Sequence, residues 1–549
     1  MHKAILITGL LALMGLSSCR ESQAAEPGAA QPSVAWIGNG GASAGGNAAA
    51  VAPRVAGEER ALPVADSEQP ASPRRSAALE KDLSQLVDAG FRKAAKLSKG
   101  KLTSAETLIS ISVRDAETGA IVADVRGARS MRPASNMKVV TTAAALALLG
   151  INGTFETRFE LAGPVEDGVL RGDLIVRGGG DPVVRDGSGG RVEAFFDPLT
   201  AALAKAGIDR IAGDVVLDEG DFLVPGTGPS WPSANQHWKD YCAFAAGLTL
   251  NGGVLEAQVT ARSAGSKASV QLHPIPTGIK QQIGVTTKAG SLNDVRVGAT
   301  SKRVTVGGAI GAHTGLVDAT FRHPDPVGLF GAVLEDRVTQ AGISIDGGIV
   351  RRRGSPAGVP LLVISSQITD SLVPINTYST NAVADQLFFK MGHDFGGGGT
   401  RAGGQTAVSL ALDELGVSAQ GLVQVDGSGL SRDNRVAPVQ LSALLWGALR
   451  GFDRGRGAAQ LFKDSLAVMG RSGTLEERMK NQAAAGHVFA KTGFIDGTSA
   501  LSGLVVRPDG RALIFSILVN YPTIGGLNKG AWKPMQEDMV ARLFAGEMP

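Results

Sequence analysis

Apolar residues recur along the chain with different spacings, and each spacing predicts a different kind of element. Residues 79–97 place them at helical intervals, which predicts an N-terminal helix. Two short β-type runs, 108–113 and 120–125, flank a polar turn and predict a hairpin. The apolar run 139–149 then predicts a buried helix that ends at Gly150, a residue suited to a helix C-terminus.

The middle of the chain, from 153 to 366, has a different character. Short alternating runs are broken there by Gly, Pro and Asp, a pattern typical of strands joined by turns. Helical spacing is confined to stretches around 192–206 and 326–341. The glycines 178–180 follow a strand, but no helix with phosphate-binding spacing comes after them, so they predict a turn. We therefore expect a largely β region, long enough for one or two small domains.

Helical spacing returns after this region and is followed by strands. The predicted elements are helices at 371–390, 406–415 and 438–449, a helical segment from Gly473, strands at 488–493, 500–506 and 512–520, and a closing helix at 534–544. Elements from both ends of the chain thus predict one α/β (α+β) domain, an antiparallel sheet flanked by helices. Its two parts would be 78–152 and 367–549, interrupted by a largely β insertion at 153–366.

The first 77 residues predict export rather than folding. His2 and Lys3 precede a short apolar core over 4–16, which is too short for a membrane span and is typical of a secretory signal. Residues 20–77 are rich in Ala, Gly, Pro and Ser and cannot bury enough apolar surface to fold. They therefore predict a flexible, disordered tether.

The signal ends in a Leu-Ser-Ser-Cys run that resembles a bacterial lipobox. The resemblance implies a signal peptide over 1–19 and lipidation of Cys19. The protein would then belong to the periplasm or cell envelope, anchored to a membrane. The residue after Cys19 is Arg20 and not Asp, which favours the outer membrane by similarity to other lipoproteins. The alternative is simple cleavage after Ala24 or the next alanine, which would give a soluble exported protein.

The overall composition narrows the function further. The chain has 549 residues, of which 43% are hydrophobic, and a net charge of only +3, which does not indicate nucleic-acid binding. Its seven histidines are scattered, and the His-Glu-x-x-His and Cys-x-x-Cys spacings of metal sites do not occur. We therefore expect neither a metal nor another cofactor. Cys242 has no expected disulfide partner, since Cys19 belongs to the signal, and is predicted to be a small buried side chain.

Ser135 and Lys138 stand at the start of the predicted buried helix, three residues apart. That spacing places both side chains on one helical face, where a lysine can accept the proton of a serine nucleophile. The Ser-x-x-Lys pattern alone is weak, because Ser98 and Lys101 share it in a charged segment. Two further motifs in the C-terminal half distinguish between these pairs.

The further motifs are a Ser-Thr-Asn triplet at 379–381, in a helical stretch, and a Lys-Thr-Gly triplet at 491–493, on a predicted strand. Ser233 and Ser291 also begin Ser-x-Asn triplets, whereas Lys-Thr-Gly occurs once in the chain. Singly, such residues are more often helix caps, edge-strand charges or turns. The order and context of all three motifs favour an active site.

The combination resembles the active site of penicillin-binding proteins and serine β-lactamases. Wider features are similar to the low-molecular-mass class C penicillin-binding proteins, the D-alanyl-D-alanine carboxypeptidases and endopeptidases of the penicillin-binding protein 4 type. These features are the long insertion, Gly-Gly-Asp-Pro at 179–182, Asp-Gly-Ser-Gly-Leu-Ser at 426–431, Ala-Pro at 437–438 and Ser-Gly-Thr-Leu at 472–475. The resemblance covers nearly everything from Leu79 onward. It implies a penicillin-binding-protein fold, peptidoglycan peptides as substrates and β-lactam antibiotics as inhibitors.

The resemblance also implies a role for each motif residue. Ser135 would attack the carbonyl between two D-alanines and form an acyl-enzyme. Lys138 would act as the base when neutral, a state that burial and a positive Lys491 would both favour. Ser379 would relay a proton to the leaving amine, and Asn381 would hold Lys138 and the substrate amide.

Across the cleft, Lys491 and Thr492 would hold the substrate carboxylate, and Gly493 would leave room for the substrate along the strand edge. The backbone N–H groups of Ser135 and Phe494 would form the oxyanion hole. Phe494 departs from the family pattern, in which Ser or Thr usually follows Lys-Thr-Gly. The missing hydroxyl weakens the expected preference for a free C-terminal D-alanine and leads to the hypothesis of a shift toward cleavage of cross-links.

Two other functions fit parts of the pattern. A β-lactamase shares the motifs but does not need a long insertion. A catalytically weak peptidoglycan-binding lipoprotein is the second alternative, and Phe494 is consistent with it, although the intact motifs argue against it.

Overall fold

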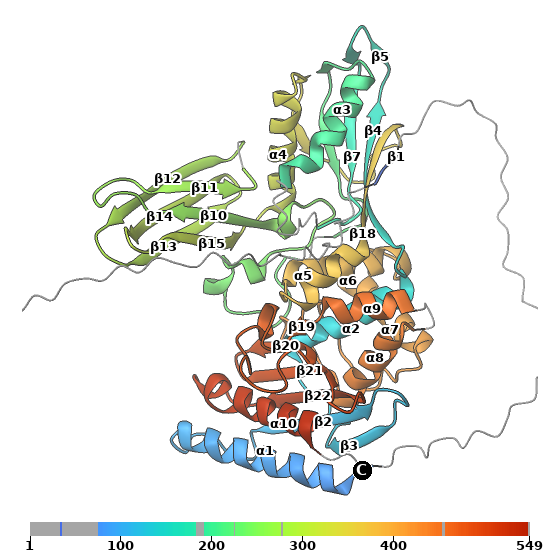
Figure 1. Ribbon diagram of the computed structural model, residues 1–549. Helices are drawn as coiled ribbons and strands as arrows, with labels where there is room; N and C mark the ends of the chain where they lie inside the picture. Colours follow the sequence, from blue (N-terminus) through green and yellow to red (C-terminus); the bar gives the residue numbers. More distant parts are fainter. Residues whose placement is uncertain are drawn as a thin grey trace, which may run out of the picture. The chain divides into compact units, whose positions relative to one another are not determined.

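The computed structural model describes residues 33–35, 75–182, 192–223, 226–275, 278–452 and 456–546 (Figure 1). The predicted signal peptide, Cys19 and nearly all of the predicted tether lie outside these ranges. Three residues of that segment form β1 (Ser33–Ala35), which pairs antiparallel with β18 (Val359–Gln367). In the described ranges, none of the helices has the length and apolar character that a membrane span requires.

One six-stranded sheet is built from both ends of the folded chain. Its neighbouring strands are all antiparallel, and β2 pairs with β22 over its full length, which joins the N-terminal part to the C-terminal part. The predicted hairpin is confirmed, since β2 pairs with β3, and the predicted strands β21 and β22 also pair with each other. In spatial order the strands are β19 (Ala467–Val468), β20 (Val488–Ile495), β21 (Thr498–Val506), β22 (Ala512–Asn520), β2 (Leu108–Asp115) and β3 (Ile121–Val125).

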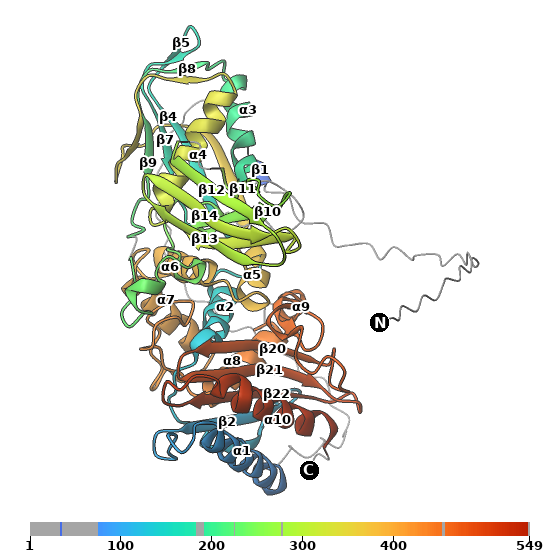
Figure 2. The ribbon, with the colours of Figure 1, turned by 90° about the vertical axis from the view of Figure 1, so that its left-hand side faces the viewer.

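Helices cover both faces of this sheet, which explains why its central strands β21 and β22 are buried along nearly their whole length. Along β21, Leu501 and Val505 pack toward α1 and α10, whereas Ala500 and Leu504 pack toward α2. Figures 1 and 2 show α1 and α10 side by side along the sheet. The helices are α1 (Ala77–Leu97), α2 (Met137–Leu148), α5 (Leu372–Asn376), α6 (Asn381–Phe395), α7 (Arg401–Glu414), α8 (Pro438–Arg450), α9 (Arg456–Ser465) and α10 (Lys533–Ala545).

The helix α2 is the centre of this part of the chain. Its residues from Met137 to Ala147 are all buried, as the apolar run predicts, and α5, α6, α7 and α8 pack around it. The helix ends at Leu148, and Gly150 follows with a φ of 68°, a left-handed conformation that suits glycine.

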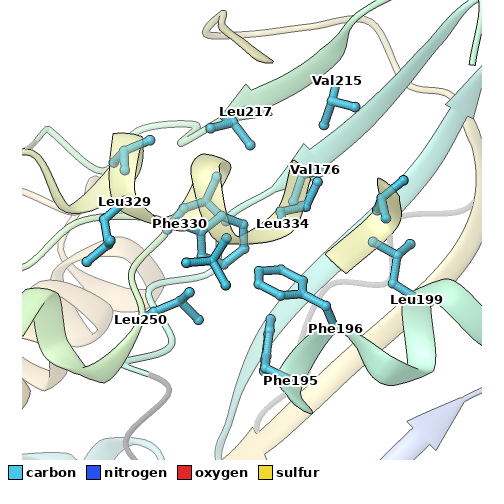
Figure 3. Packing of buried hydrophobic residues seen from close by; sticks show 14 of the residues in the cluster. Val176, Phe195, Phe196, Leu199, Val215, Leu217, Leu250, Leu329, Phe330 and Leu334 are labelled. Carbon is cyan, nitrogen blue, oxygen red and sulfur yellow. The ribbon is translucent and has the colours of Figure 1, made fainter. Parts of the chain in front are cut away.

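The segment between α2 and α5 is rich in strands, with the predicted helical stretches present as α3 (Asp197–Lys205) and α4 (Pro326–Gln340). Phe196, from the 3-10 turn before α3, and Phe330 of α4 meet edge to face in a core closed by the sheet residues Val176 and Leu217 (Figure 3). The domain boundaries at 152 and 366 stay predictions. The strands are β4 (Thr154–Ala162), β5 (Val165–Glu166), β6 (Val169–Leu170), β7 (Asp173–Arg177), β8 (Arg210–Ile211), β9 (Val215–Asp218), β10 (Val254–Thr260), β11 (Ser269–His273), β12 (Lys280–Lys288), β13 (Asn293–Thr300), β14 (Arg303–Gly311), β15 (Leu316–Arg322), β16 (Ser344–Ile345) and β17 (Ile349–Arg351), with β18.

Candidate active site

Ser135 lies in a single 3-10 turn, Ala134–Asn136, that precedes α2. Ala134 has a φ of 47°, a left-handed conformation that alanine rarely adopts and that the surrounding packing must hold. Asn136 helps to fix this turn, because its Nδ2 donates to Ser502 Oγ of β21 at 2.6 Å. The sheet therefore fixes the turn on which the serine is presented.

Gly493 allows the turn to approach β20 closely. A Cβ on this residue would lie 2.7 Å from the carbonyl oxygen of Pro133 and 3.2 Å from the backbone nitrogen of Asn136. Close packing against the nucleophile turn thus explains why a glycine occupies this position of the Lys-Thr-Gly motif. Its predicted role in leaving space for a substrate stays a prediction. Among the described residues, β19 pairs with β20 only at Phe489 and Ala490, so the edge beyond Ala490 is open there.

Lys138 is hydrogen-bonded on three sides. Its Nζ donates to Asn381 Oδ1 and to the carbonyl oxygen of Ser428, each at 2.6 Å, and lies 3.1 Å from Ser135 Oγ. The side chain is 0% exposed, and burial lowers the pKa of Lys138 to about 8. Because the two carbonyl-type oxygens each take an N–H, a neutral Lys138 has its lone pair left for the Ser135 hydroxyl.

Lys491 is also completely buried, and burial lowers its pKa well below the usual range, with the charge of Lys138 as a second cause. Its Nζ donates to the carbonyl oxygen of Thr492 at 3.0 Å. Burial and a positive Lys491 were both expected to favour the neutral form of Lys138; the part played by burial is supported, and the expectation for Lys491 is corrected. Burial lowers that pKa, and the charges of Asp385 and Asp426 oppose the lowering.

Asn381 begins α6 and connects the site to the β-rich segment. Its Oδ1 accepts from Lys138, and its Nδ2 donates to the carbonyl oxygen of Tyr241 at 2.8 Å. Ser379 lies two residues earlier, half-buried, with a φ of 64°. Within the described residues, the structure records no hydrogen bond for the Ser379 hydroxyl. The amide of this motif is therefore engaged with Lys138, and the hydroxyl is left available.

The Asp-Gly-Ser-Gly turn supplies a group that was not predicted from the sequence. The peptide unit between Ser428 and Gly429 accepts from Lys138 through its C=O and donates from Gly429 N to Asp426 Oδ1 at 2.8 Å. A hydrogen bond at the N–H end polarises the peptide and strengthens its oxygen as an acceptor. Asp426 thus acts on Lys138 through one peptide group as well as through its charge.

Asp426 is held by further donors. It accepts from Ser431 N at 2.7 Å, from Asn434 Nδ2 at 2.8 Å and from the indole nitrogen of Trp231 at 3.0 Å. With Gly429 N, four N–H donors thus fix the position of this carboxyl group. In the sequence this motif only resembles a family pattern, and these contacts give it a physical function.

Asp385 is a second buried carboxyl group beside the lysine. It lies one turn after Asn381 on α6 and accepts from Ser428 N at 2.8 Å. Burial, followed by the charge of Asp426, raises the pKa of Asp385 to about 8. The four-residue spacing from Asn381 was the signal in the sequence that could have identified it.

The remaining predicted positions divide between exposed and structural ones. Thr492 and Phe494 are two apart on β20 and share a face, and Phe494 is 53% exposed. Cys242 is free and fully buried, and burial raises its pKa to about 11. Ser98 follows the last turn of α1, where its hydroxyl donates to Ala95 O, so the competing Ser-x-x-Lys pair is structural.

The helix-covered sheet and the serine–lysine pair together define a serine peptidase of the penicillin-binding class. The model of the D-Ala-D-Ala carboxypeptidase 3 (S13) family matches residues 94–543, and the chain belongs to this family. In the described part of the chain, no cluster of three or more His, Cys, Asp or Glu side chains suited to a metal occurs.

Curated relatives and solved structures agree with this assignment. The chain is 33% identical over 431 residues to a D-alanyl-D-alanine carboxypeptidase of Actinomadura sp. (strain R39), covering 75% of this chain and 77% of the relative. It is 26% identical over 425 residues to the D-alanyl-D-alanine carboxypeptidase DacB of Haemophilus influenzae, covering 74% and 84%. The crystal structure of penicillin-binding protein 4 (DacB) from Haemophilus influenzae has the same fold, with a TM-score of 0.67, 24% identity and coverage of 82% of this chain and 99% of that chain. The predicted family, fold class and enzyme class are confirmed.

Proposed function

We propose that this chain is a serine D-Ala-D-Ala carboxypeptidase that hydrolyses peptidoglycan stem peptides through an acyl-enzyme on Ser135. The observation that carries the proposal is the 3.1 Å separation between Lys138 Nζ and Ser135 Oγ, in a lysine whose pKa burial lowers to about 8. A neutral Lys138 accepts the hydroxyl proton as Ser135 Oγ bonds to the carbonyl carbon between the two D-alanines. The C–N bond then breaks, the amine of the terminal D-alanine takes up a proton, and water hydrolyses the ester.

The other motif residues position the substrate and the proton. Ser379, whose hydroxyl is free within the described residues, relays the proton from Lys138 to the leaving amine. Asn381 orients Lys138, which its 2.6 Å hydrogen bond supports. The backbone N–H groups of Ser135 and Phe494 stabilise the oxyanion.

The Lys-Thr-Gly strand holds the substrate carboxylate in this proposal. Thr492 supplies a hydroxyl, and Lys491 acts from behind the strand, since its side chain is buried. An approaching carboxylate favours the charged form of Lys491 and so attracts a proton to that side of the cleft. Phe494 provides no second hydroxyl, which supports a shift toward cleavage of cross-links.

Labelled penicillin tests the proposed function and separates it from its alternatives. The wild-type chain is expected to form a long-lived adduct that Ser135→Ala loses and that Ser98→Ala, in the competing Ser-x-x-Lys pair, retains. Rapid turnover of the label would instead support a β-lactamase, and no adduct would support a catalytically weak binding protein. A thermal unfolding curve for each variant excludes misfolding as the cause of a lost adduct.

We also propose that the protein is exported to the periplasm and anchored by a lipid on Cys19, with the outer membrane favoured by Arg20. The supporting observation is the Leu-Ser-Ser-Cys run after a short apolar core. Growth with a labelled fatty acid should label the wild-type chain and Cys242→Ala but leave Cys19→Ala unlabelled. Equal labelling of both variants, or none of the wild type, contradicts the anchor.

A further inference from the structure

A hollow of about 420 Å³ lies beside Thr492 of the Lys-Thr-Gly strand. Thr474, in its wall, has its Oγ1 2.8 Å from Thr492 Oγ1, so the hollow continues from the residue proposed to hold the substrate carboxylate. Tyr378, directly before Ser379 in the chain, is 66% exposed and forms another part of the wall. The lining residues are Tyr378, Arg471, Ser472, Gly473, Thr474 and Glu476.

The wall of the hollow carries one charge of each sign. Arg471 and Glu476 are both exposed to solvent, and within the described residues the structure records no ion pair or side-chain hydrogen bond for either. A ligand that carries a carboxylate and an amine or amide N–H, some distance apart, would pair with both of them.

The backbone that carries these charges is fixed by neighbouring elements. Arg471 N donates to Val468 O at 3.0 Å, and Thr474 N donates to Thr377 O at 3.2 Å. The Arg471 guanidinium rests on Gly486, where a Cβ would lie 2.5 Å from it. The hollow is therefore largely formed before a ligand arrives, which reduces the entropy lost on binding.

We propose that the hollow is a subsite for the leaving group of cross-linked peptides, an inference that rests on the proposed function. In this proposal the carboxylate next to the scissile bond stays with Thr492. When a terminal D-alanine leaves, its side chain is only a methyl group, so nothing enters the hollow. When a cross-link is cut, the leaving amine belongs to a residue of a second stem peptide. The rest of the second stem peptide extends into the hollow, where Arg471 binds its C-terminal carboxylate and Glu476 binds one of its N–H groups.

Three probes test the subsite: two peptides that differ only on the leaving-group side, and a β-lactam that carries no second stem peptide. They are a cross-linked muropeptide dimer, a monomeric peptide ending in D-Ala-D-Ala, and labelled penicillin. Arg471→Gln and Glu476→Gln should each lower kcat/KM for the dimer about tenfold, the loss of one charge-assisted hydrogen bond, mainly through KM. Release of D-alanine from the monomer and the penicillin acylation rate should stay within about twofold, because neither probe reaches the hollow.

Matched controls lie beside the two charges. Lys480→Gln and Glu477→Gln remove an exposed cation and an exposed anion that pair with each other outside the hollow, and they should leave all three rates unchanged. The inference is overturned if Arg471→Gln cleaves the dimer normally, if it slows all three probes equally, or if the wild type releases D-alanine but does not cut the dimer. A wild type that forms no adduct on Ser135 would instead overturn the proposed function itself.

Discussion

Lys138 Nζ and the carbonyl oxygen of Ser428 lie 2.6 Å apart, although 290 positions separate the two residues in the chain. The β-rich segment lies between them in sequence, so the base is held only when both ends of the chain have assembled. Thr141, one turn further along α2, repeats the link, because its Oγ1 donates to Gly427 O at 2.6 Å. The turn at 426–431 thus docks on α2 through two side chains that share a face.

The first prediction concerns the pH dependence of acylation. Lys138 must be neutral to accept the proton of Ser135, and burial lowers its pKa to about 8. The acylation rate with labelled penicillin should therefore be low at pH 6, rise with pH through a midpoint near 8, and level off above it. Lys138→Arg should abolish acylation throughout, since a guanidinium does not deprotonate in this range. A flat profile between pH 6 and 9 in the wild type contradicts this role for Lys138.

A second prediction separates the two buried carboxyl groups. Burial and the charge of Asp426 raise the pKa of Asp385 to about 8, so Asp385 is largely neutral at pH 7, and asparagine has the same shape. Asp385→Asn should lower the free energy of unfolding by less than about 1 kcal/mol at pH 7, whereas Asp426→Asn, which replaces a carboxylate with several N–H donors, should lower it by about 2–4 kcal/mol.

The pH dependence of unfolding provides the check on this pair. A raised pKa in the folded state means that the unfolded chain ionises first, so Asp385 destabilises the wild type as the pH rises from about 4 toward about 8. Asparagine does not titrate. Urea unfolding at pH 5 and pH 8 should therefore show Asp385→Asn gaining stability relative to the wild type at the higher pH. If the difference in stability between the variant and the wild type is the same at pH 5 and pH 8, Asp385 is ionised in the folded state at both pH values.

A third prediction tests the contact between the Asp-Gly-Ser-Gly turn and the nucleophile turn. Gly429 has a φ of 81°, and a Cβ there would lie 1.9 Å from Ala134 O. Gly510 has the same φ of 81°, but a Cβ there would meet nothing within 4 Å. Gly510→Ala should therefore lower stability by only about 1–2 kcal/mol, the cost of left-handed alanine. Gly429→Ala should lower the free energy of unfolding by more than this. It should also slow penicillin acylation at least about tenfold, because Ser135 is displaced. Equal effects of the two variants in urea unfolding and acylation would contradict the contact.

The sequence predicted the side chains of the site better than the backbone groups that contact them. Ser135, Lys138 and Asn381 belong to short motifs, and the structure brings them together, because helical spacing and apolar runs place α2 and α6 correctly. The carbonyl of Ser428 was missed, since any residue can supply a backbone oxygen and no residue type marks it.

The limits of the sequence elsewhere have similar physical causes. The helical segment expected from Gly473 is a single 3-10 turn, Gly473–Leu475, because Gly473 takes a φ of 57° and packs on Thr377. The charge state of Lys491 depends on its burial, which the sequence does not reveal. Its position on a strand at a sheet edge suggested contact with solvent instead. Tertiary contacts decided both cases.

The last prediction addresses Phe494. Phe494 shares a face of β20 with Thr492 and is exposed, so a hydroxyl in its place would stand beside the one proposed to hold the substrate carboxylate. Phe494→Thr should raise D-alanine release from a monomeric peptide about three- to tenfold relative to cleavage of a cross-linked dimer, the effect of one added hydrogen bond to a charged group. In Phe494→Val the new side chain has nearly the shape of threonine but no hydroxyl. This variant therefore separates the effect of the added hydrogen bond from the effect of removing the ring. If threonine and valine give the same ratio of the two rates as the wild type, the residue after Lys-Thr-Gly does not set the balance between the two reactions.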